Sequence, residues 1–377
     1  MKEALCSLVT DEKKVEYFEL VYDLIFVYLI GRSNSLLDRV EGGFVSLATF
    51  VNYLLSSLIV IQVWYYTTVF INRFGKNSLR DKLMMLVNMF LLYIMGACTI
   101  NGWDLNYYAF AASWMLILLN IALQYFLKLR EAESGCEKRF IREILIVLLV
   151  QAAVIGATIP VYSVTGRTLG PWAVWIGFLV SPFLTKAPVN FEHLSERVML
   201  YVVFTFGEMI ITVAAYFSDG FTLETVYFAL VSFLVAAGLF FSYGFMYDKL
   251  LDRSRADNGT LYMVLHVFMI ISLSCVTAAL EFMRDAEILA GAKNAMLVIS
   301  LLAFFLCLAL TEHWSVRRFR MPRRFLLLLL AEFAAFAVLM ILCTGHSYAG
   351  GAVVVVFIYA QLLTLRLSEK HTLQREA

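Results

Sequence analysis

Residues 16–30 read Glu16-Tyr-Phe-Glu19-Leu-Val-Tyr-Asp23-Leu-Ile-Phe-Val-Tyr-Leu-Ile30, an apolar run with three carboxylates in its first half. On a helix, Glu16, Glu19 and Asp23 follow i, i+3, i+7 spacing and share one face. A charged carboxylate inside a membrane helix costs at least about 2.5 kcal/mol, so such groups usually act on an ion, a proton or a partner side chain. We therefore expect a first membrane helix that turns its acids toward the protein interior.

The composition of the chain indicates a membrane protein. Of its 377 residues, 61% are hydrophobic and 16% are charged, against about 45–50% and 25% in soluble domains. The net charge of +1 gives no indication of a nucleic-acid partner. About 20 apolar residues span a bilayer, and this window predicts an all-α, polytopic protein of twelve transmembrane helices. They are expected near 17–34, 44–72, 83–103, 107–128, 143–163, 171–185, 198–217, 222–247, 260–282, 294–312, 325–344 and 350–366.

The positions of lysine and arginine predict the orientation. With twelve spans, 25 of the 30 basic residues fall at the two termini and in the loops on one side. Cytoplasmic loops carry the excess of basic residues. We therefore expect a protein of the cytoplasmic (inner) membrane with both termini in the cytoplasm. The first and sixth spans are short or interrupted, as helices that line a cavity often are.

The chain lacks the common motifs of soluble chemistry. It contains no P-loop, no HExxH and no GxSxG. Its six cysteines are scattered singly, without a Cys/His pair at the spacing of metal ligands. We expect no catalytic residues, no cofactor and no metal site. Uphill transport by this chain would have to use an ion gradient.

A weak internal repeat relates the two halves. Glu19 matches Glu196 at an offset of 177 residues, and Asn88 matches His266 at 178. We interpret 1–185 and 186–377 as two six-helix repeats. Because six is an even number, both repeats begin on the same side and are parallel. A pathway between such halves would be lined by equivalent helices, of which the first and seventh are the natural candidates.

The seventh helix carries its own polar residues. Glu196 and Arg197 are expected at its cytoplasmic end, where capping and pairing with one another is as good an explanation as function. Glu208 lies twelve residues beyond Glu196, about 18 Å deeper. Thr205 shares its face. We favour a functional role for Glu208, because deep acids in membranes default to one.

Two further positions have competing interpretations. Asp23 lies one turn deeper than Glu19, and it is interpreted equally as an ion site or as a structural clasp that accepts hydrogen bonds from Trp64, Tyr65 or Asn88. His266 is more often a packing residue in such a setting, and a proton relay is the alternative.

The same residues resemble a known family. Glu19-Leu-Val-Tyr-Asp23-Leu-Ile-Phe26-Val resembles the signature that opens the bacterial low temperature requirement A (LtrA) family. Glu196-Arg197, Phe206-Gly207-Glu208 and His266 are similar to motifs on its later helices. The family's late Trp-Trp-x-Tyr-Phe-Asp is Phe240-Phe241-Ser-Tyr243-Gly-Phe here. The resemblance implies a multi-pass membrane protein linked to growth in the cold.

A more distant resemblance is to potassium and proton channels built from six-helix repeats. Asp23, Trp64 and Asn88 match residues on the first three helices of that class. There the first helix lines the pore, which implies a constriction near Tyr28. The chain lacks the Arg and Phe-Ser of the class motif, and its second repeat lacks the Asp.

We expect cation or proton permeation through a polar pathway between the two repeats, with Glu19, Asp23 and Glu208 handling the ion. The expected partners are membrane lipid and a monovalent cation or proton, and a homo-oligomer is left open. The alternatives are a proton-coupled small-solute transporter, an intramembrane enzyme or lipid-handling protein that uses Glu208 and His266, and a non-transporting protein that supports the membrane in the cold.

Overall fold

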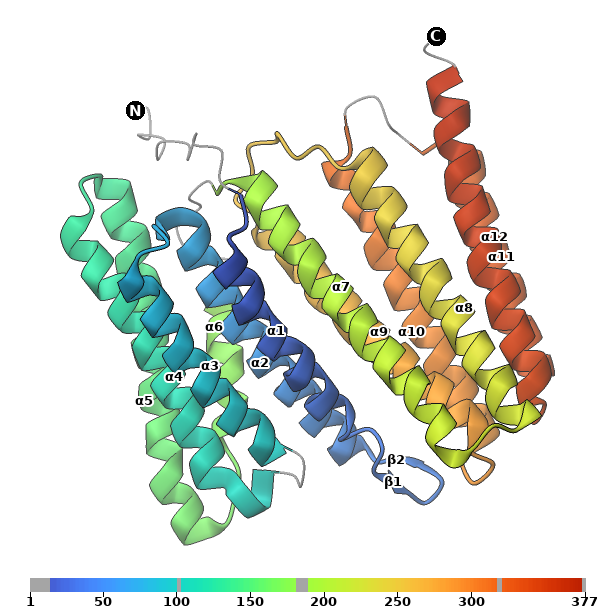
Figure 1. Ribbon diagram of the computed structural model, residues 1–377, viewed down its shortest axis with the longest axis horizontal. Helices are drawn as coiled ribbons and strands as arrows, with labels where there is room; N and C mark the ends of the chain where they lie inside the picture. The colour runs from blue at the N-terminus through green and yellow to red at the C-terminus, as the bar shows by residue number, and fades with distance from the viewer. Residues whose placement is uncertain (1–13, 100–102, 181–188, 317–320, 375–377) are drawn as a thin grey trace. The chain divides into compact units, whose positions relative to one another are not determined.

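A computed structural model describes residues 14–99, 103–180, 189–316 and 321–374. These residues are almost entirely helical, which confirms the predicted all-α class (Figure 1). The helices are α1 (Tyr17–Asn34), α2 (Leu47–Phe74), α3 (Leu79–Thr99), α4 (Trp103–Glu131), α5 (Gly135–Thr165), α6 (Val174–Val180), α7 (Phe191–Ala215), α8 (Leu223–Phe245), α9 (Thr260–Arg284), α10 (Ala290–Leu310), α11 (Arg323–Leu342) and α12 (Ser347–Gln374). Short helical turns are η1 (Gly170–Ala173), η3 (Tyr216–Asp219), η4 (Met246–Leu250) and η5 (Thr311–Trp314).

Ten of the helices in the described residues are long and apolar enough to cross a membrane. The remaining two are α1 and α6, the two that the sequence marks as interrupted or short. The 18 residues of α1 include Glu19, Asp23 and Arg32, and α6 has only seven residues. Twelve helices are therefore present in the described residues, as expected, and ten of them meet the length and apolarity of a membrane span. The expected end of the sixth helix at residue 185 lies outside the described residues.

The second helix begins later than its apolar pattern predicts. Residues 44 and 45 belong to a short antiparallel hairpin, in which β1 (Val40–Glu41) pairs with β2 (Phe44–Val45). Its turn is Gly42-Gly43, with φ of 62° and 89°. Glycine adopts such positive φ values at no steric cost, so this dipeptide favours a tight hairpin. The expected helix start at residue 44 is therefore corrected to Leu47.

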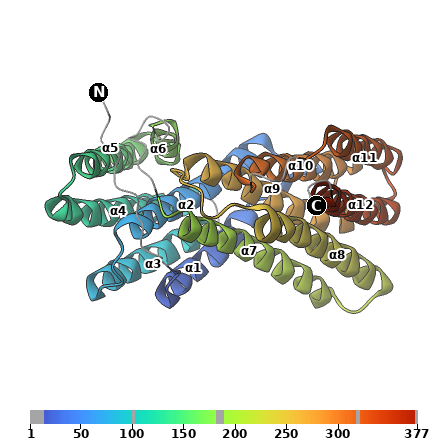
Figure 2. The ribbon, with the colours of Figure 1, turned by 90° about the horizontal axis from the view of Figure 1, so that it is seen from above.

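The chain folds as two compact units. The first contains residues 14–39, most of 47–201 and 254–267; the second contains 40–46, 202–253 and most of 268–374. In the first unit α3, α4 and α5 pack in sequence order, and α1 packs on α2 and α3 (Figure 2). In the second unit α12 packs between α8 and α11. The interpretation as repeats 1–185 and 186–377 stays a prediction, and its boundary lies outside the described residues.

A close approach between α1 and α3 is centred on Gly96. A Cβ atom at this position would lie 2.6 Å from Cε1 of Tyr28 and 2.8 Å from Cδ2 of Leu29. A Cβ atom at Gly207, which is also helical, would meet no atom within 4 Å. Glycine at this helix–helix contact allows the two backbones to come together, as small residues do in membrane helices.

We expect opposite effects of alanine at these two glycines. Gly96→Ala should lower the free energy of unfolding by about 1–3 kcal/mol through overpacking, whereas Gly207→Ala should raise it by about 0.5–1 kcal/mol through reduced backbone entropy. Thermal unfolding in detergent, followed by circular dichroism, measures both. Equal shifts of the two variants would contradict the close α1–α3 contact.

Candidate functional site

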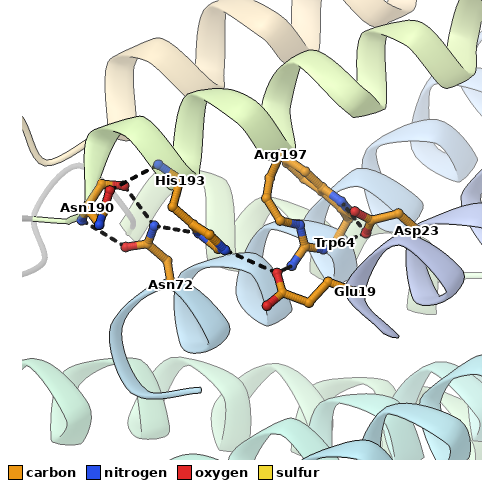
Figure 3. Close-up of polar contacts among 7 residues, drawn as sticks. All are labelled: Glu19, Asp23, Trp64, Asn72, Asn190, His193 and Arg197. Atoms are coloured by element: carbon orange, nitrogen blue, oxygen red, sulfur yellow. Dashed lines mark hydrogen bonds and ion pairs between the residues drawn. The ribbon is translucent and has the colours of Figure 1, made fainter. Parts of the chain in front are cut away.

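Three helices of the first unit bring their polar faces together. Figure 3 shows Glu19 and Asp23 from α1, Trp64 and Asn72 from α2, and Asn190, His193 and Arg197 from the start of α7. Each helix spaces these residues by three, four, seven or eight positions, which places them on one face. We call these seven residues the buried charge network.

Arg197 joins the two acids of α1. Its Nη1 donates to Oε2 of Glu19 at 3.1 Å, and its Nη2 donates to Oδ1 of Asp23. Arg197 and Asp23 have no exposed surface, and Glu19 is 5% exposed. Because each charge has been removed from water, the pairing must offset a desolvation penalty of several kcal/mol per ion.

Trp64 completes the surroundings of Asp23. Its indole Nε1 donates to Oδ1 of Asp23 at 3.1 Å, so the expected clasp between the first two helices is present. The ring packs on Tyr201, with centroids 4.8 Å apart, and the Arg197 guanidinium lies 5.9 Å from its centroid. Aromatic side chains thus cover the ion pairs and keep the local dielectric low, which strengthens the attraction within the pairs.

The contribution of the Trp64 hydrogen bond can be isolated with a second tryptophan. Trp114 is also buried, but its Nε1 has no partner among the described residues. We expect Trp64→Phe to lower the free energy of unfolding by about 1.5–3 kcal/mol more than Trp114→Phe, because hydrogen bonds to charged groups have that value. Chemical unfolding of both variants in detergent gives the difference. Equal losses would show that Trp64 contributes packing alone.

A clamp made by Asn72 and Asn190 positions the start of α7. The Asn190 side chain caps the helix by accepting from the backbone N–H of His193 at 3.0 Å. The backbone N–H of Asn190 donates to Oδ1 of Asn72 at 3.0 Å, and Nδ2 of Asn72 donates to the backbone oxygen of Asn190 at 2.9 Å. These two backbone bonds fix which end of the Asn72 amide carries the nitrogen.

The orientation of the Asn72 amide determines the tautomer of His193. Nδ2 of Asn72 lies 3.0 Å from Nδ1 of His193. Since that amide nitrogen is a donor, Nδ1 must be the acceptor and carries no proton. The ring proton is then on Nε2, which donates to Oε2 of Glu19 at 3.2 Å. His193 is therefore held as the neutral imidazole, because a second ring proton would point at the amide hydrogens of Asn72.

Asp23 shares its cationic partner with a second carboxylate. Both Asp23 and Glu19 pair with the single guanidinium of Arg197. In addition, Oδ2 of Asp23 is buried and has no hydrogen-bond partner among the described residues. A buried polar atom without a partner is unfavourable. A proton or a small cation at Oδ2 of Asp23 would remove this cost.

Two of the predicted site residues in this unit lie away from the network. Tyr28 stacks on Tyr93 of α3 with centroids 5.6 Å apart. Asn88 is fully buried, and its Oδ1 accepts from Nδ2 of Asn120 on α4 at 2.8 Å. These residues hold α1, α3 and α4 together.

The remaining predicted residues are buried in apolar helices. Thr205 is 1% exposed and Glu208 8% exposed. Oε1 of Glu208 accepts from the hydroxyl of Thr212 at 3.2 Å, one turn further along α7. His266 is 2% exposed, and its Nδ1 lies 2.8 Å from the backbone oxygen of Tyr262. This bond fits the interpretation of His266 as a packing residue, while its role as a relay stays a prediction.

Two expectations from the sequence are corrected. Glu16 precedes α1 and is exposed, so only Glu19 and Asp23 form the acidic face. Arg197 does not pair with Glu196: both of its ion pairs are with α1, and Glu196 is half-buried. Among the described residues, no three His, Cys, Asp or Glu side chains lie together as metal ligands.

His193, Asn72 and Asn190 were not predicted as site residues from the sequence. The signal was present, because Asn190, His193 and Arg197 follow i, i+3, i+7 spacing, the same pattern that marks the acids of the first helix. A histidine on the face that also carries a deep arginine is a candidate for the same network.

The comparisons with known proteins agree with the first helix motif. The family model described as bacterial low temperature requirement A protein (LtrA) matches residues 14–360. That range includes every residue of the buried charge network. No curated protein and no solved structure matches the chain.

Proposed function

The chain belongs to the bacterial low temperature requirement A family, and we propose that this multi-pass membrane protein lets protons or monovalent cations cross the membrane. We place it in the cytoplasmic membrane with both termini in the cytoplasm. In this orientation the loops rich in lysine and arginine are cytoplasmic, as the positive-inside rule requires. In this proposal the chain moves ions and performs no covalent chemistry.

The observation that carries the proposal is the buried Oδ2 of Asp23, which has no hydrogen-bond partner among the described residues. Asp23 shares the single guanidinium of Arg197 with Glu19. Water does not reach this oxygen, so a proton or cation is its favourable companion. A carboxylate that gains and loses such a companion is the elementary step of ion or proton passage.

Polar residues recur along one face of α7. Successive residues at intervals of three or four positions are His193, Arg197, Tyr201, Thr205, Glu208 and Thr212. Such intervals keep side chains on one helix face. Glu208 follows Arg197 by eleven residues, about 16 Å along the helix at 1.5 Å per residue. Glu208 is therefore a further carboxylate on this helix face.

The second candidate function is proton-coupled transport of a small solute. The specific observation in its favour is the complete burial of Asp23 and Arg197. A site that is sealed on all sides has to open and close for each ion, which is the behaviour of a transporter more than of a continuous pore. The same carboxylates would then couple protons to the solute.

Flux measurements in liposomes test the proposal. Purified protein is reconstituted with an internal pH dye, and a potassium or proton gradient is imposed. We expect the flux of Asp23→Asn to be lower than that of the wild type by about tenfold or more. This corresponds to a transport barrier that is higher by at least about 1.4 kcal/mol. Glu208→Gln should also reduce it. Asp23→Asn keeps the size of the side chain, and Arg197 keeps its ion pair with Glu19, so the variant should remain folded.

Glu16→Gln is the matched control, because it makes the same charge change on an exposed residue just before α1. Its flux should equal that of the wild type. Absence of flux in the wild type under every gradient, or equal flux in Asp23→Asn and Glu16→Gln, would contradict ion passage through the network. Flux that requires an added solute and saturates with it would favour the transporter.

A further inference from the structure

A small apolar cavity lies in the second unit and shares no residue with the buried charge network. Its volume is about 130 Å³, close to that of apolar cavities of about 150 Å³ that admit a benzene-sized molecule. It lies between α10, α11 and α12, and its walls include Leu306, Ala309, Leu326, Leu329, Phe333 and Leu365. Most of the lining side chains are apolar, so the cavity suits part of a hydrocarbon chain.

The cavity opens toward the outer surface of its unit. Leu306 on α10 is 55% exposed, and Leu326 and Leu330 on α11 are 46% and 56% exposed. The buried share of α11 is small for a helix of this length. In a membrane these leucines contact acyl chains, so a chain can enter the gap between α10 and α11 from the side.

The two ends of the gap between α10 and α11 are held by polar contacts. At one end Nδ2 of Asn294 donates to the backbone oxygen of Met340 at 3.0 Å. At the other end Oε1 of Glu312 accepts from the backbone N–H of Met321 at 2.8 Å. Glu312 and Met321 also line the cavity. The end of the cavity beside Glu312 and Met321 is therefore its polar end.

Basic side chains gather at that polar end. Arg323 and Arg324 begin α11 and are exposed; they precede the cavity residue Leu326 by one turn or less. The start of α11 packs against the end of α12, where the ring centroids of Phe325 and His371 lie 5.8 Å apart. On α12 the exposed residues Arg366 and Lys370 follow the cavity residue Leu365. These four residues form the basic cluster.

The cluster has a positive excess and an open helix end. Its four cations outnumber the two carboxylates of the neighbouring described segments, Glu312 and Glu369. The first turn of α11 contains no acid, and Pro322 provides no side-chain cap. Free backbone N–H groups at a helix start favour a phosphate, and adjacent arginines add bidentate donors.

We propose that this cavity and the basic cluster form a binding site for an anionic phospholipid. One acyl chain occupies the gap between α10 and α11, and the headgroup phosphate lies on Arg323 and Arg324 at the start of α11. The inference is independent of ion passage, because it rests on residues of the second unit that take no part in the buried charge network.

Native mass spectrometry of the full chain tests the site. Delipidated protein in detergent is titrated with phosphatidylglycerol or phosphatidylcholine that carry identical acyl chains. Wild type should retain the anionic lipid preferentially, and this preference should be roughly 30-fold weaker in Arg323→Gln/Arg324→Gln, because each basic residue beside an anionic headgroup contributes about fivefold. Ala309→Phe fills the cavity and should reduce retention of the same lipid.

Two controls make the outcome decisive. Arg130→Gln/Arg142→Gln removes two exposed arginines from the first unit, and Leu310→Phe enlarges an exposed residue of α10 that does not line the cavity. Both should behave as the wild type. Full retention in Ala309→Phe would overturn the cavity as the chain site. Equal loss in the two double arginine variants would reduce the effect to net charge. A dimer that forms in place of lipid binding would assign the gap to a second copy.

Discussion

Replacing Arg197 with methionine is expected to lower the free energy of unfolding by about 3–5 kcal/mol, the range seen when one partner of a buried ion pair is removed. The variant keeps a side chain of similar length but leaves Glu19 and Asp23 without their guanidinium. Asp23 has no exposed surface, so water does not replace the lost partner. Unfolding in detergent, followed by circular dichroism, measures the loss.

A triple variant distinguishes lost charge pairing from lost packing. Glu19→Gln/Asp23→Asn/Arg197→Met removes all three charges together, and replacement of whole buried ion clusters by neutral groups is often neutral or stabilising. We therefore expect it to recover most of the stability lost in Arg197→Met, while flux remains absent because no carboxylate is left in the network. A triple variant as unstable as the single one would show that Arg197 acts mainly through its volume.

Replacing Asn72 with aspartate is expected to change the protonation of His193 by a whole proton. The introduced carboxylate would still accept from the backbone N–H of Asn190, but it would present an acceptor to Nδ1 of His193 where the wild type presents a donor. The ring can then bind a second proton between two carboxylates, the introduced one and that of Glu19. The backbone oxygen of Asn190 loses its bond, at a cost of about 1–3 kcal/mol.

Nitrogen-15 NMR of histidine-labelled protein in lipid bilayers reports this change. The wild type should show a neutral ring protonated at Nε2 that disappears in His193→Gln. In Asn72→Asp at neutral pH the same residue should show a doubly protonated ring. Asn120→Asp is the matched control, because Asn120 bonds Asn88 in the same unit; its His193 signal should equal that of the wild type. A neutral ring in Asn72→Asp would contradict the amide-fixed tautomer.

The helices could be predicted from sequence because hydropathy is a local property. The range 17–34 predicts α1 to the residue, and the acids within it predict that this helix departs from an ordinary apolar span. The hairpin before α2 was missed, because Phe44 and Val45 are as apolar as the helix that follows. There the conformational freedom of Gly42 and Gly43 prevailed over the apolar pattern.

The site could be predicted only in part. Glu19, Asp23 and Trp64 were identified as polar groups in an apolar setting, and the bond between Trp64 and Asp23 follows from two consecutive helices that pack. Pairing of Arg197 with its sequence neighbour Glu196 was one of two interpretations left open, whereas the structure pairs Arg197 with Glu19 and Asp23. His193 was overlooked, because a single histidine carries no signal until the groups on both sides of its ring are known.

The sequence by itself determined that this chain crosses a membrane many times, that it belongs to its family, and that the acids of its first helix need companions. Each of these follows from the cost of burying polar groups in hydrocarbon, which is a property of individual residues. Only the tertiary structure decided which companions they have. Arg197 and His193 lie more than 170 residues beyond Glu19, and helix faces so far apart along the chain are matched by packing and charge in three dimensions, which no local pattern encodes.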